Sequence, residues 1–171
     1  PISLQDIQSE PRGGEGQEAQ LSSIGKRERN RVMGERVRVN EVGLRDGLQN
    51  QPRTVPLEGK LAMFDALAAA GLRSFEVTSF VSPKAVQQMA DATELFGRLP
   101  PANGMNYEAL IPNLKGYERA VDAGAKTISL VLAATDSFNR KNINMSLDET
   151  IAVCTAVFER ARRDGIKPRA Y

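Results

Sequence analysis

The chain has 171 residues, with 23 lysines and arginines against 21 aspartates and glutamates, for a formal net charge of +2. This balance gives no reason to expect a nucleic-acid partner. No apolar run approaches the roughly 18 residues of a membrane-spanning helix, so we expect no membrane partner either. The sequence contains no histidine and a single cysteine, Cys154. It therefore holds no Ser-His-Asp triad, no internal disulfide and no cysteine-based zinc cluster.

Residues 1–36 contain no aromatic residue, and their aliphatic residues follow no sustained period. Such a stretch buries too little apolar surface to offset the entropy lost on ordering, and we expect a disordered extension. It has no apolar segment typical of a signal peptide, and its scattered acidic residues argue against a transit peptide, which favours a cytoplasmic location. Because Met33 is the first methionine, one hypothesis is that Met33 is the natural start and that the preceding residues are non-native.

From residue 37 onward, short runs rich in β-formers alternate with longer helical patterns. Apolar residues at three- and four-residue spacing predict helices over 57–67 and 151–161. Ser146 followed by Glu149 is typical of a capping box at a helix start. The expected strands are 37–42, 74–80, 105–111, 127–132 and 166–171.

Three glycines, Gly71, Gly124 and Gly165, each stand between a predicted helix and the next strand, where a left-handed residue closes the helix. Repeated helix–glycine–strand units predict a parallel α/β sheet. Four repeats take 129 residues, about 32 each, close to the roughly 31 per unit of a (β/α)8 TIM barrel. A doubly wound sheet can have similar spacing. About five strands and four helices correspond to the N-terminal portion of a barrel, so we expect residues 37–171 to be a partial TIM-barrel domain and the chain a fragment of a longer protein.

In a parallel barrel the active site lies at the carboxyl ends of the strands. The first expected strand leads into EVGLRDGLQN, residues 41–50. Alternation places Val37, Val39 and Glu41 on one face, which directs Glu41 into the barrel mouth if that face is the interior. Asp46 can offer a hard oxygen to Mg²⁺ or Mn²⁺, and Arg45 can stabilise a developing oxyanion. The alternative interpretation is a surface turn with a solvated Arg–Asp pair.

The second expected strand carries Glu76 in its middle, and alternation places Thr78 on the same face. A buried charge is costly unless it is paired or binds a metal, so Glu76 is either a site residue or part of a salt bridge inside the barrel. Its partner would be Arg45 or a basic residue from strands that this sequence does not contain, and a site role is compatible with an Arg45 pair. Ser79 lies at the end of this strand. Cys154 lies on an apolar helical stripe and is expected in the core. Residues 140–144 precede a predicted helix start and are a candidate anion site.

Four ordered runs carry a resemblance to a known family: EVGLRDGLQN, then FEVTSFVSPKAVQQMAD (75–91), PNLKGYERAVDAGAK (112–126) and KNIN (141–144). Together they resemble the 3-hydroxy-3-methylglutaryl-CoA lyases over residues 37–171. RDG alone marks a wider superfamily that includes isopropylmalate and homocitrate synthases, whereas RDGLQN and TSFVSPK are typical of the lyase branch. The resemblance implies a TIM barrel and a retro-aldol, Claisen-type cleavage of an acyl-CoA substrate to acetyl-CoA and acetoacetate. It also implies a divalent cation, Mg²⁺ or Mn²⁺, and a role in leucine catabolism.

By this resemblance Asp46 matches the family's metal-ligand aspartate, Arg45 matches its catalytic arginine and Glu76 matches an active-site glutamate. The family completes its metal site with a His-x-His pair and an asparagine, and it carries a catalytic cysteine on a late loop. This sequence contains no counterpart of those groups, and Cys154 is not that cysteine, so we expect the isolated chain to be inactive. The residues expected to contact substrate are Glu41, Gln49 and Ser79.

The sequence leaves three alternatives open. The whole protein could cleave a longer 3-hydroxyglutaryl-CoA analogue, or it could be a related synthase that condenses acetyl-CoA with a 2-oxo acid. In the third alternative, from another class, the chain is a non-catalytic half-barrel that associates with itself as a homo-oligomer.

Overall fold

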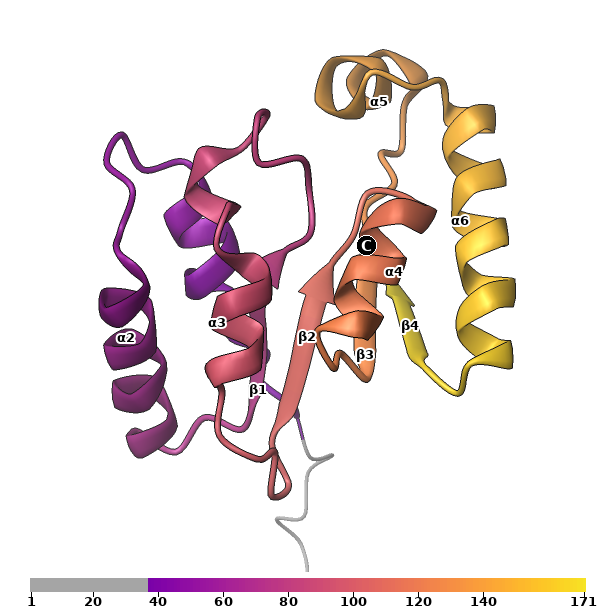
Figure 1. Cartoon of the computed structure of the whole chain (residues 1–171). Helices are drawn as coiled ribbons and strands as arrows, with labels where there is room; N and C mark the ends of the chain where they lie inside the picture. Colours follow the sequence, from indigo (N-terminus) through magenta and orange to yellow (C-terminus); the bar gives the residue numbers. More distant parts are fainter. Residues whose placement is uncertain (1–36) are drawn as a thin grey trace, which may run out of the picture. The chain divides into compact units, whose positions relative to one another are not determined.

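The structure is a computed structural model that describes residues 37–171. The extension expected over residues 1–36, with the hypothesis about Met33, lies outside the described residues. Four parallel strands form one sheet in the order β1-β2-β3-β4, which confirms the α/β class (Figure 1). The strands are β1 (Ser74–Ser79), β2 (Asn106–Leu110), β3 (Thr127–Leu130) and β4 (Lys167–Ala170).

The strand expected over residues 37–42 is reduced to a single bridge between Glu41 and Phe75. Two backbone hydrogen bonds flank this bridge, from the Glu41 amide to Ser74 and from the Glu76 amide to Glu41, both at 2.8 Å. Val37 and Val39 are 88% and 62% exposed. The expected alternation therefore fails, because the chain pairs with β1 only at Glu41 and then curls at once into a helical turn.

That turn is a short π-helix, η1 (Gly43–Gly47). The remaining helices follow in chain order, and none of those described is long and apolar enough to cross a membrane. They are α2 (Leu57–Ala69), the 3₁₀ turn η2 (Gln87–Met89), α3 (Ala92–Arg98), α4 (Leu114–Asp122), α5 (Asp136–Ile143) and α6 (Leu147–Arg163).

The local signals for helix ends are confirmed. Ser146 caps α6, and its capping box with Glu149 is complete in both directions. Gly71, Gly124 and Gly165 have φ values of +99°, +97° and +70°, in the left-handed region that glycine enters without steric cost. Each therefore turns a helix end into the strand that follows.

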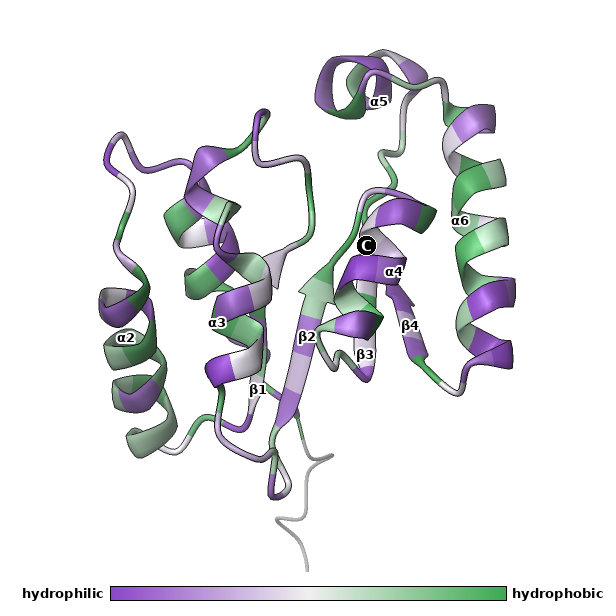
Figure 2. Cartoon of the chain, in the orientation of Figure 1, coloured by the Kyte–Doolittle hydropathy of each residue, from purple (hydrophilic) through white to green (hydrophobic). Residues whose placement is uncertain are grey.

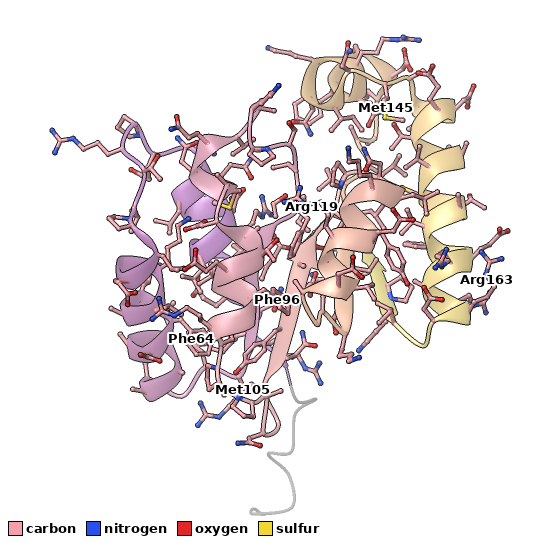
Figure 3. The ribbon with its side chains drawn as sticks, in the orientation of Figure 1. Phe64, Phe96, Met105, Arg119, Met145 and Arg163 are labelled. Carbon is pink, nitrogen blue, oxygen red and sulfur yellow. The ribbon has the colours of Figure 1, made fainter. Side chains whose placement is uncertain are left out.

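The helices α2, α3, α4 and α6 cover one face of the sheet (Figure 1). Phe64 of α2 and Phe96 of α3 belong to the same buried cluster as Phe75 and Ile128 of the sheet (Figure 3). Phe64 packs against Phe75 with ring centroids 5.0 Å apart. Cys154 on α6 packs against this cluster, as expected, and burial raises the pKa of its thiol, which disfavours the reactive thiolate.

A β-bulge in β1 decides which side chains face away from the helices. The register runs from Glu76 opposite Glu108 to Thr78 opposite Ala109, so Val77 is the extra residue. Thr78 consequently lies on the helix side, where its hydroxyl contacts the Met89 sulfur at 3.6 Å. The expectation that Thr78 shares a face with Glu76 is wrong, because the extra residue reverses the alternation beyond it.

Candidate active site

The sheet face opposite the helices is polar. Glu76 pairs with Glu108 across β1 and β2, and Ser129 pairs with Arg169 across β3 and β4. The hydrophilic residues of β2 and β4 appear in purple in Figure 2. Beyond the bulge, Ser79 pairs with Leu110, two positions after Glu108, and so returns to the polar face. One side of the sheet therefore builds the hydrophobic core and the other gathers charge.

The Glu76 carboxylate is the centre of this face and is fully buried. One of its oxygens accepts a hydrogen bond from Nε of Arg45. The other accepts from the Ser129 hydroxyl at 2.9 Å and from the Tyr171 hydroxyl at 2.7 Å. These three donors replace the lost water. Of the two expected kinds of salt-bridge partner for Glu76, the structure shows Arg45.

Arg45 lies on η1, which the carbonyl of Val42 closes by accepting from the Asp46 amide at 2.7 Å. Its guanidinium binds Glu76 on one side and, through Nη1, the Asp46 carboxylate at 2.7 Å on the other. The Arg45 side chain is 13% exposed and that of Asp46 is 58% exposed. The interpretation of a solvated Arg–Asp pair is therefore wrong for Arg45, which links a buried carboxylate to an accessible one.

The three residues expected to contact substrate differ in burial and in hydrogen bonding. A Glu41 oxygen accepts from the Gly43 amide at 2.6 Å, so this carboxylate folds back over the start of η1. A Cβ at Gly43 would lie 2.8 Å from that oxygen, so any other residue here would make the Glu41 carboxylate shift. Gln49 is half-buried just after η1. Ser79 is fully buried, and its hydroxyl has no hydrogen-bond partner among residues 37–171.

A metal site is incomplete in the part of the chain that the structure describes. No group of three or more histidine, cysteine or acidic side chains is placed there to hold an ion. Asp46 uses one oxygen on Arg45 and is more than half exposed. Its donor chemistry suits a hard cation, but Mg²⁺ requires near-octahedral oxygen coordination, which one carboxylate does not provide. The residues present thus fit one ligand of such a site.

Four residues of the polar face were not predicted from the sequence: Glu108, Ser129, Arg169 and Tyr171. The sequence could have indicated Glu108 as a site residue, because it is a carboxylate in the middle of an expected strand, just as Glu76 is. Burial raises the pKa of Glu108, with a smaller increase from nearby Glu76, while Arg169 opposes the shift. Burial and the hydrogen bond to Glu76 raise the pKa of Tyr171 to about 12. Ser129 and Tyr171 are neutral residues, and only the sheet register brings them to Glu76.

The candidate anion site at residues 140–144 is not formed as expected. Most of that segment belongs to α5, and the amides that open α6 bond to side chains of the chain itself. The Leu147 amide donates to Asp136 at 2.8 Å and the Glu149 amide to the Ser146 hydroxyl at 3.2 Å. An acidic side chain thus takes the place that an anion would occupy.

A cavity of about 260 Å³ lies at the amino ends of β2 and β3, near Phe96, Met105 and Lys126. Arg45 and Asp46 follow the paired position Glu41 and lie toward the opposite, carboxyl ends of the strands. The cavity is therefore separate from the charged cluster.

A parallel sheet with helices on one face, and an arginine–carboxylate cluster toward the carboxyl ends of its strands, is typical of the (β/α)-barrel enzymes. The HMGL-like family matches residues 36–170. The chain belongs to this family.

Three comparisons give the extent of the match. The chain is 44% identical over 153 residues to the mitochondrial hydroxymethylglutaryl-CoA lyase of Rattus norvegicus, covering 90% of this chain and 45% of that protein. It is 43% identical over 136 residues to a Pseudomonas aeruginosa 3-hydroxy-3-isohexenylglutaryl-CoA/hydroxy-methylglutaryl-CoA lyase, covering 80% of this chain and 45% of the relative. A solved HMG-CoA lyase of Acinetobacter baumannii, in complex with coenzyme A and 3-methylmalate, aligns with a TM-score of 0.74 at 36% identity, over 78% of this chain and 44% of that one.

The chain thus spans less than half the length of these relatives. The expected correspondence with the N-terminal portion of the barrel is confirmed.

Proposed function

We propose that the whole protein cleaves 3-hydroxy-3-methylglutaryl-CoA to acetyl-CoA and acetoacetate, and that Arg45 is its enolate-stabilising group. The observation that supports this is the pairing of the Arg45 guanidinium with buried Glu76 and accessible Asp46. The pairing holds the positively charged Arg45 guanidinium toward the carboxyl ends of the strands, with Asp46 beside it. Family membership and the lyase names of the relatives agree with the proposal.

In this reaction the tertiary hydroxyl loses its proton and becomes the ketone of acetoacetate as the C2–C3 bond breaks. The electron pair of that bond moves into the thioester, and the resulting enolate takes a proton to give acetyl-CoA. Negative charge therefore grows on the thioester oxygen, where a preorganised guanidinium lowers the barrier. Glu76 positions that guanidinium, because Arg45 Nε is bound to it and the carboxylate itself is held by two hydroxyls.

Asp46 would supply one ligand to Mg²⁺ or Mn²⁺. When bound, such an ion lowers the pKa of a coordinated hydroxyl and orients it. Ser79 would contact the substrate, because a buried hydroxyl without a partner costs about 1–3 kcal/mol and gains from a ligand hydrogen bond. Glu41 and Gln49 complete the proposed substrate contacts around η1.

The test is acetyl-CoA formation from 3-hydroxy-3-methylglutaryl-CoA with Mg²⁺ or Mn²⁺, using the protein expressed from its own gene. Arg45→Met should lower kcat on the order of 10²–10³-fold, the loss typical of one oxyanion stabiliser. The matched control is Arg163→Met, which removes an exposed arginine at the end of α6 (Figure 3) and should leave kcat unchanged. Turnover that does not depend on Arg45 would contradict the proposal. The 171-residue chain by itself should release no acetoacetate, since Asp46 alone cannot fix the cation.

A longer 3-hydroxyglutaryl-CoA analogue is the second candidate substrate, because the name of the Pseudomonas aeruginosa relative includes the isohexenyl compound. Comparing kcat/KM for the methyl and isohexenyl substrates distinguishes the two. A role in leucine catabolism follows only if the methyl substrate is preferred.

The compartment is also a proposal. We propose the cytoplasm, and the alternative is the mitochondrion, which the name of the rat relative gives for that protein. Fractionation of cells that express the protein from its own gene distinguishes these locations.

A further inference from the structure

Beyond the contacts of Arg45, the polar face holds a second carboxylate–guanidinium pair. Glu108 on β2 lies in register with Glu76, and its side chain is 2% exposed. Nη1 of Arg169 on β4 approaches both Glu108 oxygens, at 3.3 and 3.5 Å. Because β3 lies between β2 and β4, this pair reaches across a strand and ties the end of the sheet to its middle.

Arg169 has a second neighbour. Its guanidinium carbon lies 4.5 Å from the centroid of the Tyr171 ring, a distance at which a cation is attracted to the face of an aromatic ring. The Tyr171 hydroxyl in turn donates to Glu76 at 2.7 Å. A continuous line of contacts therefore runs from Glu108 through Arg169 and Tyr171 to Glu76, which holds Arg45.

The two side chains of the Glu108–Arg169 pair differ in exposure and so in rotamer freedom. The Arg169 side chain is 43% exposed, and a long exposed arginine has many rotamers open to it. Glu108 is buried on a central strand and lacks that freedom. The fixed carboxylate therefore selects the Arg169 rotamer that lies against Tyr171. Conversely, the charge on buried Glu108 depends on a nearby cation.

We propose that Glu108 is a positioning residue for Arg45, which acts through Arg169 and the ring of Tyr171 to hold Glu76 in place. The inference rests on the proposed function only for its catalytic consequence. Its structural content, that the Tyr171 and Arg45 hydrogen bonds depend on Glu108, can be measured without any substrate.

The experiment is NMR on the 171-residue chain with ¹³Cζ-labelled tyrosine and ¹⁵N-labelled arginine. The chain has three tyrosines, and Tyr171→Phe assigns the Tyr171 resonance. Glu108→Gln should shift the Tyr171 Cζ resonance toward that of a solvent-exposed tyrosine and move the Arg45 Nε–H resonance upfield. Tyr117, whose hydroxyl donates to Asp164 at 2.8 Å outside this line of contacts, should keep its resonance and reports that the fold is intact.

Two further variants distinguish a positioning role of Glu108 from a general effect on the stability of the fold. Arg169→Lys keeps the positive charge but removes the planar guanidinium, and it should shift Tyr171 and Arg45 as Glu108→Gln does. Asp91→Asn breaks a different buried ion pair, with Lys60, and should leave both resonances in place. If Glu108→Gln does not fold, Arg169→Gln, at a partly exposed position, tests the same link.

An unchanged Tyr171 resonance in a folded Glu108 or Arg169 variant would overturn the inference. A shift of Tyr171 in Asp91→Asn would also overturn it, because the effect would then follow stability in general. In the protein expressed from its own gene, Glu108→Gln should lower kcat more than it changes KM. Shifted resonances in a protein without lyase activity would refute the proposed function and leave the positioning role intact.

Discussion

Replacing Glu76 by glutamine is the most direct test of how the charged cluster is held. The substitution keeps the shape of the side chain but removes its charge. It also replaces one of two acceptor oxygens with an NH₂ group, which cannot accept a hydrogen bond. Arg45 Nε donates to one of those oxygens, and Ser129 and Tyr171 donate to the other. Whichever way the amide turns, at least one donor loses its partner.

The size of the effect follows from burial. Removing one partner of a buried ion pair typically costs about 3–5 kcal/mol. Here the Arg45 side chain keeps 13% exposure and a second carboxylate, Asp46, at 2.7 Å, so the remaining charge is partly compensated. We therefore expect the low end, about 3 kcal/mol of unfolding free energy. This is a large part of the roughly 5–15 kcal/mol typical of a domain.

Urea unfolding followed by circular dichroism measures this loss. With an m value of about 2 kcal/mol/M, the midpoint should fall by roughly 1.5 M. The matched control is Glu58→Gln, which breaks the surface pair of Glu58 with Arg98, whose side chains are 75% and 44% exposed. Its midpoint should not move measurably, since exposed pairs contribute little. A Glu76→Gln midpoint equal to that of the wild type would refute the argument that the cluster depends on this buried charge.

Three further outcomes are expected, each measured by chemical unfolding. Gly124→Ala should lower the free energy of unfolding by about 1–2 kcal/mol, because the φ of +97° at this position strains any residue with a Cβ. Its control is Gly97→Ala in α3, where a Cβ meets open space, and this change should raise the free energy of unfolding by about 0.5–1 kcal/mol. Equal effects of the two substitutions would contradict this reasoning. Asp91→Asn should cost about 3 kcal/mol of unfolding free energy, because it leaves the buried Lys60 ammonium without a carboxylate. A neutral result would show that the other hydrogen bond of this ammonium, to the Gln88 carbonyl at 2.6 Å, suffices. Burial raises the pKa of Glu108, so the folded state binds the Glu108 proton more tightly than the unfolded chain does. The stability that this proton contributes is fully present below the unfolded pKa of about 4.3 and is lost as the pH rises through the folded pKa. The stability difference between wild type and Glu108→Gln should change in that direction over this range, and a constant difference would rule out the shift.

The sequence predicted the parts of this fold that depend on local chemistry. A capping box needs only Ser146 and Glu149 three residues apart, and a helix-closing glycine such as Gly71 needs only its position between two patterns. The need of Glu76 for a cationic partner was also predictable, since a carboxylate in a buried strand is costly when unpaired. Arg45, which follows the neighbouring expected strand, was one candidate for that partner. The motifs of the resemblance likewise lie in contiguous runs of residues.

The side-chain faces of β1 and the length of the first expected strand depend on how the backbones pair. The two-residue alternation of a strand sequence does not determine this pairing. The bulge at Val77 reversed the expected face of Thr78 and returned Ser79 to the side of Glu76. The expected first strand shrank to one bridge at Glu41 because its backbone curls into η1 directly afterwards.

The sequence by itself determined the class of fold, the helix ends and the identity of the charged residues, because short-range sterics and hydrogen bonding fix these. Only the tertiary structure decided that Tyr171, 95 positions after Glu76 in the chain, donates to the same carboxylate as Ser129. Sheet register sets such contacts, and register arises from the packing of whole elements.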